Sequence, residues 1–446
     1  MINPREIALK ILVDIDNENA YSNIQINKKM NKDMDIRDQN LVREIVYGII
    51  ENKLYIDYII CNASKVKLKK IHPNILEILR IGIYQILFMD KIPNSAAVNE
   101  SVKLAKKYGH KGTIGYINGV LRAIIRNTEK FTYIDRTDKI NYLSIKYSHP
   151  KWMVERWVKE FGVEFTETLC MANNETPSLN IRVNTLKINK IDLILKLKNR
   201  GIKLTEGLYA KDCLIAEDAH NITSLKEFED GLFTIQDESS MLAAQIMNPK
   251  EDSIILDVCS APGGKSTHIA QLINNKGMII SRDIFEHKLK LILENSNRLG
   301  IDIIEVENHD ALKRDANLIG KIDYLLLDAP CSGLGLIRRK PEIKWNRIED
   351  NISALSKLQY DIIINVKDYV KLGGTLVYST CTIEKDENIN LIDRFIEENP
   401  EFKLVSIEDR FEYKENLNTL KEGYIQLFPN IHNTDGFFIA KMVKEL

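Results

Sequence analysis

The chain has 446 residues, of which 44% are hydrophobic and 28% charged, and its formal net charge is −1. This composition is typical of a globular protein and excludes a disordered chain, which has fewer apolar residues and a larger net charge. The longest apolar runs are far shorter than the roughly 20 residues of a membrane-spanning helix, and the charged N-terminus has no signal-peptide core. We therefore expect a cytoplasmic protein without a membrane segment.

Residues 1–128 are predicted to be all-helical, because apolar residues such as Leu41, Ile45, Val46 and Ile49 recur at helical spacing. Residues 1–130 hold 21 Lys and Arg against 14 Asp and Glu, a net charge of +7, and the remainder carries −8. Such a basic segment predicts contact with a polyanion. A merely solvated surface is the alternative, and it stays open for the lysine run Lys65, Lys67, Lys69 and Lys70.

Residues 129–147 are polar and show no sustained period, which predicts a linker. Residues 148–235 predict a small α+β module. Its helices are expected in HPKWMVERWVKEFG, ended by Gly162, and in IDLILKLKNRG, and its strands in SLNIRVNTL and KLTEGLYAKDCLIAE.

From residue 236 to residue 446, apolar runs of strand length alternate with helix-like stretches. The runs are SIILDV, GMIISRD, DIIEVENHD, DYLLLDAP and GTLVYSTC. This alternation predicts a parallel, doubly wound, Rossmann-like α/β sheet. Ligands bind such sheets at the carboxyl ends of the strands, which here carry CSAPGGK, Asp283, Asp310, DAPCSG and STCT.

The stretch DVCSAPGGKSTHIA predicts a strand, a glycine turn and a helix that begins near Ser266. The turn allows close backbone approach to a ligand, and the helix N-terminus offers free N–H groups. Asp283 ends the next strand, and a carboxylate about 20 residues after such a turn commonly binds ribose hydroxyls. The sequence therefore predicts a nucleoside-bearing cofactor. A phosphate-binding GxxxxGK[ST] loop fits less well, because Cys259 replaces its first glycine and Pro262 lacks an N–H; an ordinary tight turn is the remaining alternative.

Two cysteines follow strand ends: Cys331 comes after Asp328, and Cys381 lies in STCT. A single cysteine at a strand end is more often structural, but two at one sheet edge beside a carboxylate indicate thiol chemistry. A thiol of pKa about 8.5 needs a cation or a helix N-terminus to ionise, and Lys265 is one candidate. A thiolate that adds to carbon 6 of cytosine makes carbon 5 nucleophilic, and Asp328, if protonated, can donate to ring N3. The following Arg338, Arg339 and Lys340 are suited to phosphate contacts.

These motifs resemble the RNA cytosine-C5 methyltransferase family. The likeness covers residue 148 to the end and is carried by SHPKW, RVN, QDESS, CSAPGGK, DAPCSG, RRKPEIKW, GGTLVYSTCT with Glu387-Asn388, and DGFFIAKM. Residues 1–128 resemble the NusB antitermination-factor fold through NPREIALKIL, RDQNLVREIVYGI and VNESVKLAKKYG. The fusion of the two parts is similar to bacterial 16S rRNA cytosine-C5 methyltransferases.

The resemblance implies methyl transfer from S-adenosylmethionine to carbon 5 of a 16S rRNA cytosine. Cys381 would be the nucleophile, Cys331 would assist product release, and Asp328 would span cofactor and cytosine. Asp283 would bind the ribose and Asp310 would lie near the adenine. The cofactor would be wrapped by Cys259, Ser260, Ala261, Pro262, Gly263, Gly264 and Lys265. The family often has Ala in place of Ser260, and Arg282 before Asp283 is also less typical; a turn that binds through its backbone tolerates Ser260.

The resemblance further implies that residues 1–128 and 148–235 bind RNA, with 16S rRNA or a small-subunit assembly intermediate as the partner of a monomer. With no CxxC or HxxH pair, we expect no metal. Two alternatives remain open: a tRNA cytosine methyltransferase, and a NusB-like RNA-binding or antitermination factor with an inactive catalytic domain. The intact Cys331, Cys381, Asp328 and Gly263-Gly264 argue against the second alternative.

Overall fold

The structure is a computed structural model that describes residues 3–18, 22–30, 34–217, 219 and 221–445. The chain forms two compact units. The first comprises Met1–Glu175 together with Ile337–Arg347, and the second comprises Thr176–Leu336 and Ile348–Leu446. A short segment from the second half of the sequence therefore belongs to the N-terminal unit.

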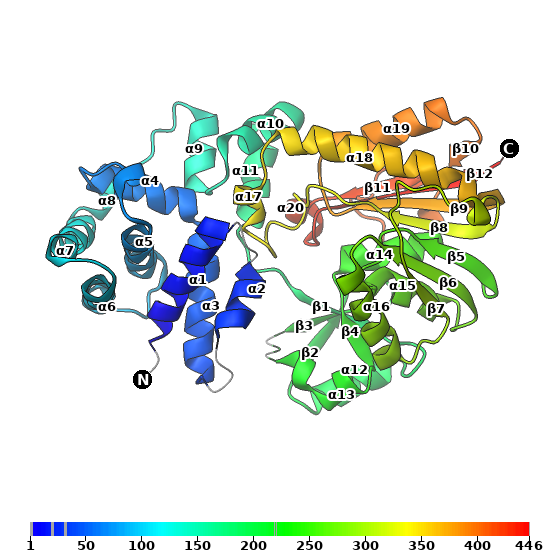
Figure 1. Cartoon of the computed structure of the whole chain (residues 1–446), viewed down its shortest axis with the longest axis horizontal. Helices are drawn as coiled ribbons and strands as arrows, with labels where there is room; N and C mark the ends of the chain where they lie inside the picture. The colour runs from blue at the N-terminus through cyan, green and yellow to red at the C-terminus, as the bar shows by residue number, and fades with distance from the viewer. Residues whose placement is uncertain (1–2, 19–21, 31–33, 218, 220, 446) are drawn as a thin grey trace. The chain divides into compact units, whose positions relative to one another are not determined.

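The first unit is helical throughout the part that the structure describes, as predicted for residues 1–128 (Figure 1). Leu9, Ile45, Ile78 and Leu121 come from four different helices and are buried in one core. The helices are α1 Pro4–Glu18, α2 Ser22–Lys29, α3 Ile36–Glu51, α4 Lys53–Ala63, α5 Pro73–Phe88, α6 Asn94–Tyr108, α7 Lys111–Arg126, α8 Thr128–Thr132, α9 Lys139–Lys146, α10 Lys151–Phe161, α11 Val163–Ala172 and α17 Ile343–Asn346, with the 3-10 turn η1 Leu68–Lys70.

Helix α9 lies within residues 129–147, for which the sequence predicts a linker. Asp138 caps its N-terminus by accepting a hydrogen bond from the backbone N–H of Asn141, and Leu143 is buried. A helix of 8 residues is too short to show a hydrophobic period in the sequence. Burial of one side chain and a capping bond stabilise it instead.

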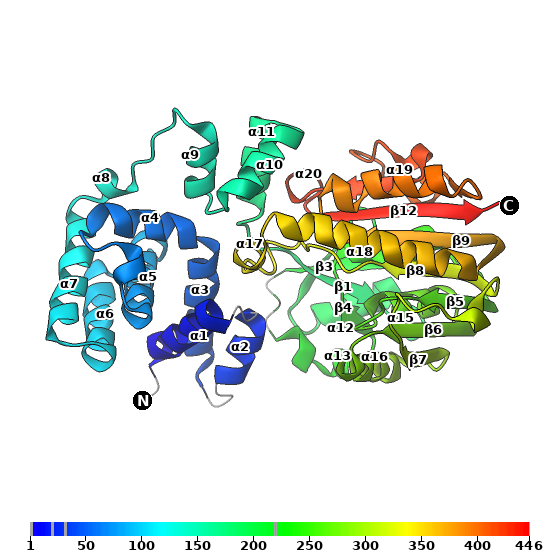
Figure 2. The same ribbon diagram turned by 45° about the horizontal axis from the view of Figure 1, so that its top comes forward.

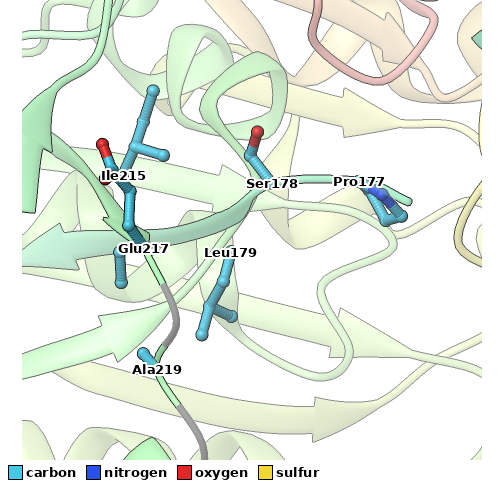
Figure 3. Close-up of a pocket in the computed structure, with 7 residues that line it drawn as sticks. Pro177, Ser178, Leu179, Ile215, Glu217 and Ala219 are labelled. Atoms are coloured by element: carbon cyan, nitrogen blue, oxygen red, sulfur yellow. The ribbon is translucent and has the colours of Figure 1, made fainter. Parts of the chain in front are cut away.

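The second unit begins with a small antiparallel sheet in the order β2-β3-β1-β4. Its strands are β1 Leu179–Val183, β2 Lys203–Glu206, β3 Cys213–Glu217 and β4 Phe233–Ile235, and its helices are α12 Lys190–Lys198 and α13 Lys226–Glu229. Leu193 and Leu197 of α12 are buried against Ile181 and Val183 of β1. Figure 3 shows a hollow beside β1 and β3, bordered by Leu179, Ile215 and Glu217; its lining includes none of the predicted site residues.

The larger sheet contains the five predicted parallel strands, in the order β9-β8-β5-β6-β7. These are β5 Ser253–Asp257, β6 Gly277–Asp283, β7 Ile304–Asn308, β8 Ile322–Asp328 and β9 Val370–Thr380. Beyond β9 the sheet continues with the antiparallel strands β12 Phe437–Lys444, β10 Phe402–Leu404 and β11 Tyr424–Leu427. The prediction of a doubly wound sheet is confirmed, and the antiparallel edge extends it.

Helices cover both faces of this sheet (Figure 2). Along β8, Leu326 is buried in the core shared with α14 and α15, whereas Leu325 and Leu327 are buried in the core shared with α18 and α19. The alternation follows from the two-residue period of a strand. The helices are α14 Glu238–Met247, α15 Gly264–Leu272, α16 Glu286–Leu299, α18 Asp350–Val366, α19 Ile389–Glu398 and α20 Pro429–His432. No described helix has the length and apolar character needed to cross a membrane.

Candidate active site

The predicted site residues lie at one edge of the large sheet. The strand order reverses at β5, which pairs with β6 on one side and with β8 on the other. At such a switch point the loops after neighbouring strands diverge and leave a crevice. Two adjoining cavities lie here, and their linings include Cys259, Ser260, Ala261, Pro262, Gly264, Lys265, Asp283, Asp310, Asp328, Cys331 and Cys381.

The glycine turn is held closely against β6 and α16. The backbone N–H of Ser260 donates to the carbonyl of Arg282 at 2.8 Å, and the Ser260 hydroxyl donates to the same carbonyl at 3.0 Å. Gly263 has φ +96°, and a Cβ there would lie 3.1 Å from the Ile292 backbone. A side chain at residue 263 would therefore be both strained and crowded. Serine at residue 260 adds a bond to the turn, which explains why this departure from the family pattern is accommodated.

Asp283 closes the turn from the neighbouring strand. One carboxylate oxygen accepts from the N–H of Ala261 at 3.2 Å, and the other accepts from the N–H of Phe285 at 2.9 Å. The Arg282 side chain binds Glu307 and Asp315 instead, at 2.7 and 2.6 Å. This atypical arginine is thus engaged in ion pairs outside the turn.

The cavity beside Asp283 fits the nucleoside that the sequence predicts. Its walls include the apolar residues Ile284, Phe285, Leu312, Leu358 and Ile362. Its polar lining includes the carboxylates of Asp283 and Asp310, which accept hydrogen bonds from hydroxyl or amino groups. Apolar walls with a few polar groups are typical of cofactor sites.

The two thiols face each other across the ends of β8 and β9. The sulfur atoms of Cys331 and Cys381 are 3.1 Å apart, and neither residue forms a disulfide. The hydrogen bond with Cys381, followed by burial, raises the pKa of Cys331 well above its usual range. Either sulfur can donate in this hydrogen bond, and the raised pKa of Cys331 favours Cys331 as the donor.

Lys265 and Asp328 form an ion pair beside the thiols. The Lys265 ammonium lies 2.6 Å from one carboxylate oxygen of Asp328, and the Ser379 hydroxyl donates to the other at 2.8 Å. Burial by itself would lower the pKa of Lys265. The neighbouring Asp328, and after it Cys381, raise this pKa above its usual value. The lysine thus places a positive charge close to both the carboxylate and Cys381.

A set of buried polar residues, without an assigned role in the sequence motifs, fixes the two cysteine loops. Glu387 accepts from the N–H of Ser332 and from the side chain of Gln359, each at 2.8 Å. The Ser332 and Thr382 hydroxyls lie 2.8 Å apart. Because these residues join the loop after Cys331 to the loop after Cys381, they hold the thiols at their short separation.

Comparison with known proteins identifies the family. Residues 244–443 match "16S rRNA methyltransferase RsmB/F", residues 2–126 match the NusB family, and residues 149–223 match the ferredoxin-like domain of the RsmF/B-like methyltransferases. A Bacillus subtilis protein named "Probable ribosomal RNA small subunit methyltransferase B" is 40% identical over 99% of this chain and 98% of its own length. The chain belongs to the RsmB/F family.

Further RsmB/F-type sequences and a solved structure agree with this assignment. "Ribosomal RNA small subunit methyltransferase B" of Citrobacter koseri is 31% identical over 92% of this chain and 91% of its own length. The crystal structure of NSun6 from Pyrococcus horikoshii with SFG is 27% identical, covers 67% of this chain and 98% of its own, and superposes with a TM-score of 0.60. The fold is therefore a NusB-like helical bundle, a ferredoxin-like module and a Rossmann-like methyltransferase domain.

One buried residue of the ferredoxin-like module supports the glycine turn, a role that its RVN motif does not indicate. Arg182 is 1% exposed and donates to the Gly264 carbonyl at 2.6 Å and to the Thr267 hydroxyl at 3.0 Å, besides a bond to Gln236. Burial lowers its pKa. Arg182 thus joins β1 to the first turn of α15.

Arg182→Met should lower the free energy of unfolding of the second unit by roughly 3 kcal/mol, because a buried carbonyl and amide lose a charged donor. Cofactor binding should weaken as well. Chemical denaturation and calorimetric titration measure the two effects. Arg200→Met, which removes a half-exposed arginine paired with Glu227 in the same module, is the control and should cost under about 1 kcal/mol. Equal stability of the two variants would contradict the supporting role.

Other residues noted in the sequence lie outside the chemistry. His268 is buried beside Asp212, and burial lowers its pKa to about 4. Trp157 is buried against His149. Arg338 is 5% exposed within the first unit. Among the described residues no His, Cys, Asp and Glu group is arranged to hold a metal ion.

Proposed function

We propose that the protein methylates carbon 5 of a cytosine in 16S rRNA, with S-adenosylmethionine as the methyl donor. The observation that carries the proposal is the pair of thiols 3.1 Å apart, beside the Lys265–Asp328 ion pair and next to a nucleoside-sized cavity. Membership of the RsmB/F family supports an rRNA substrate. The cytosine must leave its base stack, because a thiol has to approach the face of the ring.

The cofactor would be held by residues 259–265, Asp283, Asp310 and Asp328. When bound, it supplies an electrophilic methyl group. The turn's backbone and the apolar wall would surround the adenosine, with Asp283 on the ribose and Asp310 near the adenine. Asp328 would lie between the two substrates. The match between this lining and a nucleoside supports the assignment.

Cys381 is the nucleophile in this proposal. It attacks as a thiolate, and both the S–H of Cys331 and the Lys265 ammonium lie close enough to assist the attack. Its sulfur forms a bond to carbon 6, the electron pair of the C5=C6 bond moves to a C4=C5 bond, and the C4=N3 pair moves onto N3. The Lys265 ammonium, 2.6 Å from Asp328, passes a proton through that carboxylate to N3. Carbon 5 then forms its bond to the methyl group as the bond from the methyl carbon to the donor's sulfur breaks, and the electron pair stays on that sulfur.

Cys331 serves product release. Cys381 is the largest cause of the raised pKa of Cys331, and that cause ends when the Cys381 sulfur becomes a neutral thioether. Cys331 then loses its proton to solvent, and its thiolate removes the proton from carbon 5. The bond between Cys381 and carbon 6 breaks, Cys381 leaves as a thiolate, and N3 returns its proton through Asp328 to Lys265. One proton is released in each cycle.

We assign binding of the RNA phosphate backbone to the helical unit. Lys65, Lys67, Lys69 and Lys70 are exposed at and before η1 and make no ion pair within the described part of the chain. Replacing all four with Gln should lower the dependence of log Kd for RNA on log salt by about 3, since each phosphate contact contributes roughly 0.7–0.9. Filter binding at several salt concentrations measures the slope.

The control variant replaces four exposed lysines of the second unit, Lys226, Lys290, Lys321 and Lys421. Equal slopes for the two variants would contradict RNA binding by the four lysines of the helical unit.

The experiment that tests the function is bisulfite mapping of rRNA and tRNA from cells with and without the gene. A 5-methylcytosine present in 16S rRNA and absent in the deletion strain supports the proposal. A modification lost only from tRNA would establish the tRNA alternative. No loss from either RNA would favour an RNA-binding factor with an inactive catalytic domain.

A further inference from the structure

The segment that follows Cys331 belongs to the helical unit. Residues 331–336 lie in the second unit, Ile337–Arg347 lie in the first, and the chain returns to the second at Ile348. We call Ile337–Arg347 the strap. In Figure 1 its short helix α17 lies among the blue and cyan helices of the first unit.

Buried hydrogen bonds hold the strap in the helical unit. The Glu342 carboxylate accepts from the N–H and the hydroxyl of Ser22, the first residue of α2, at 3.2 and 3.0 Å. The Lys344 Nζ donates to the Glu51 carbonyl at 2.8 Å, and the Trp345 indole N–H donates to the Ile50 carbonyl at 2.8 Å.

The acceptors of the last two bonds are favourable partners. Ile50 and Glu51 end α3, where carbonyls lack partners within the helix. Glu342 and Lys344 are each 1% exposed. Hydrogen bonds of such buried groups are costly to leave unmade. The strap is therefore anchored at specific positions and does not merely lie on the surface.

The other end of the same loop is attached to the catalytic strand. The N–H of Gly335 donates to the Cys381 carbonyl at 3.0 Å, and the Gly335 carbonyl accepts from Gly436 at 2.9 Å. A Cβ at Gly335 would lie 1.9 Å from the Gly436 carbonyl oxygen, so the backbones approach as closely as glycine permits. Only Leu336 separates this attachment from the strap.

We propose that the helical unit positions the two catalytic thiols through the strap. The loop after Cys331 is bonded at Gly335 to the Cys381 carbonyl. From Ile337 onward the same loop is held by the helical unit. Glu342, Lys344 and Trp345 are positioning residues that act through this loop. The inference rests on the proposed function and adds a second task for the NusB-like bundle, which is independent of RNA affinity.

The test compares full-length variants at the best-defined anchor. Glu342→Ala removes both acceptors for Ser22, Glu342→Gln keeps one oxygen, and Ser22→Ala removes the partner hydroxyl. Trp345→Phe is a milder variant that keeps the ring and loses the N–H donor. Glu349→Ala is the control, because Glu349 is an exposed glutamate outside the strap. Circular dichroism verifies folding of each variant.

Methylation of 16S rRNA is measured at saturating RNA and S-adenosylmethionine. Glu342→Ala should lower this rate about 10- to 100-fold, the effect expected from a small misplacement of a reacting group. Glu342→Gln should lower the rate less than Glu342→Ala does. The double variant Ser22→Ala/Glu342→Ala should be little slower than Glu342→Ala, because both substitutions remove the same Ser22–Glu342 contact. The Kd values for RNA and cofactor should stay within about twofold of the wild-type values, since binding residues are untouched.

A second readout needs neither substrate. The rate at which iodoacetamide alkylates Cys381, followed by peptide mass spectrometry, should rise at least about threefold in Glu342→Ala and Trp345→Phe, because a loosened loop exposes the sulfur. Unchanged alkylation and an unchanged saturating rate would overturn the inference. So would an unchanged rate with weaker RNA binding, which would make the strap an RNA-binding surface. If the wild-type protein methylates no RNA, the proposed function fails. The alkylation rates then decide by themselves whether the strap positions the two thiols.

Discussion

Cys331→Ala should accumulate as a methylated, covalent protein–RNA complex, whereas Cys381→Ala should form none. Without Cys381, no bond to carbon 6 forms, so carbon 5 is never activated, and turnover should fall by more than about a thousandfold. Without Cys331, addition and methyl transfer proceed, but the group that removes the carbon 5 proton is missing. The adduct then persists. The 3.1 Å separation of the two sulfur atoms motivates this division of roles.

A denaturing gel with labelled cofactor and RNA measures the outcome. A slow, labelled band should appear with Cys331→Ala and vanish in the double variant. Cys61→Ala is the matched control, because Cys61 is an exposed thiol on α4 and its loss should leave turnover unchanged. A band from Cys381→Ala instead would invert the two roles, and no band from either variant would remove the thiol-addition mechanism.

Asp283→Ala should weaken S-adenosylmethionine binding by about one to two orders of magnitude. The loss of a charged hydrogen-bond acceptor typically costs roughly 1.5–3 kcal/mol, and Asp283 also holds the N–H groups of Ala261 and Phe285. Asp283→Asn keeps an oxygen acceptor, so its loss should be smaller. RNA affinity should remain unchanged for both variants.

Calorimetric titration with the cofactor measures this effect. Asp302→Ala is the control, because Asp302 is an exposed carboxylate just before β7 and does not line the cavity. It should bind the cofactor as the wild-type protein does. Full cofactor affinity in Asp283→Ala would show that the end of β6 has no part in the cofactor site.

Much of the candidate site could be predicted because it follows strand ends. Parallel strands present their carboxyl ends at one edge of a sheet, so Cys259, Asp283, Asp328 and Cys381 had to meet once five parallel strands were recognised. Gly263 was likewise foreseeable as the residue of a turn that packs closely on a helix. The antiparallel strands β10, β11 and β12 were less evident, because they are short or stand apart from the alternating pattern.

The supporting contacts could not be predicted in this way. Arg182 reaches Gly264, and Glu387 reaches Ser332, across long separations in sequence. No periodicity encodes such pairs, because each bond depends on how two distant elements pack. The same holds for Arg338: the cluster RRK looked suited to phosphates, yet Arg338 is buried in the helical unit.

The sequence by itself determined the three-part architecture, the glycine turn and the two cysteines, because hydrophobic periods and local motifs act over short stretches of chain. Only the tertiary structure decided that the thiols lie in contact, that Lys265 pairs with Asp328, and that Ile337–Arg347 belongs to the helical unit. These features depend on long-range packing and on buried hydrogen bonds, whose partners are chosen by which groups would otherwise be left without one.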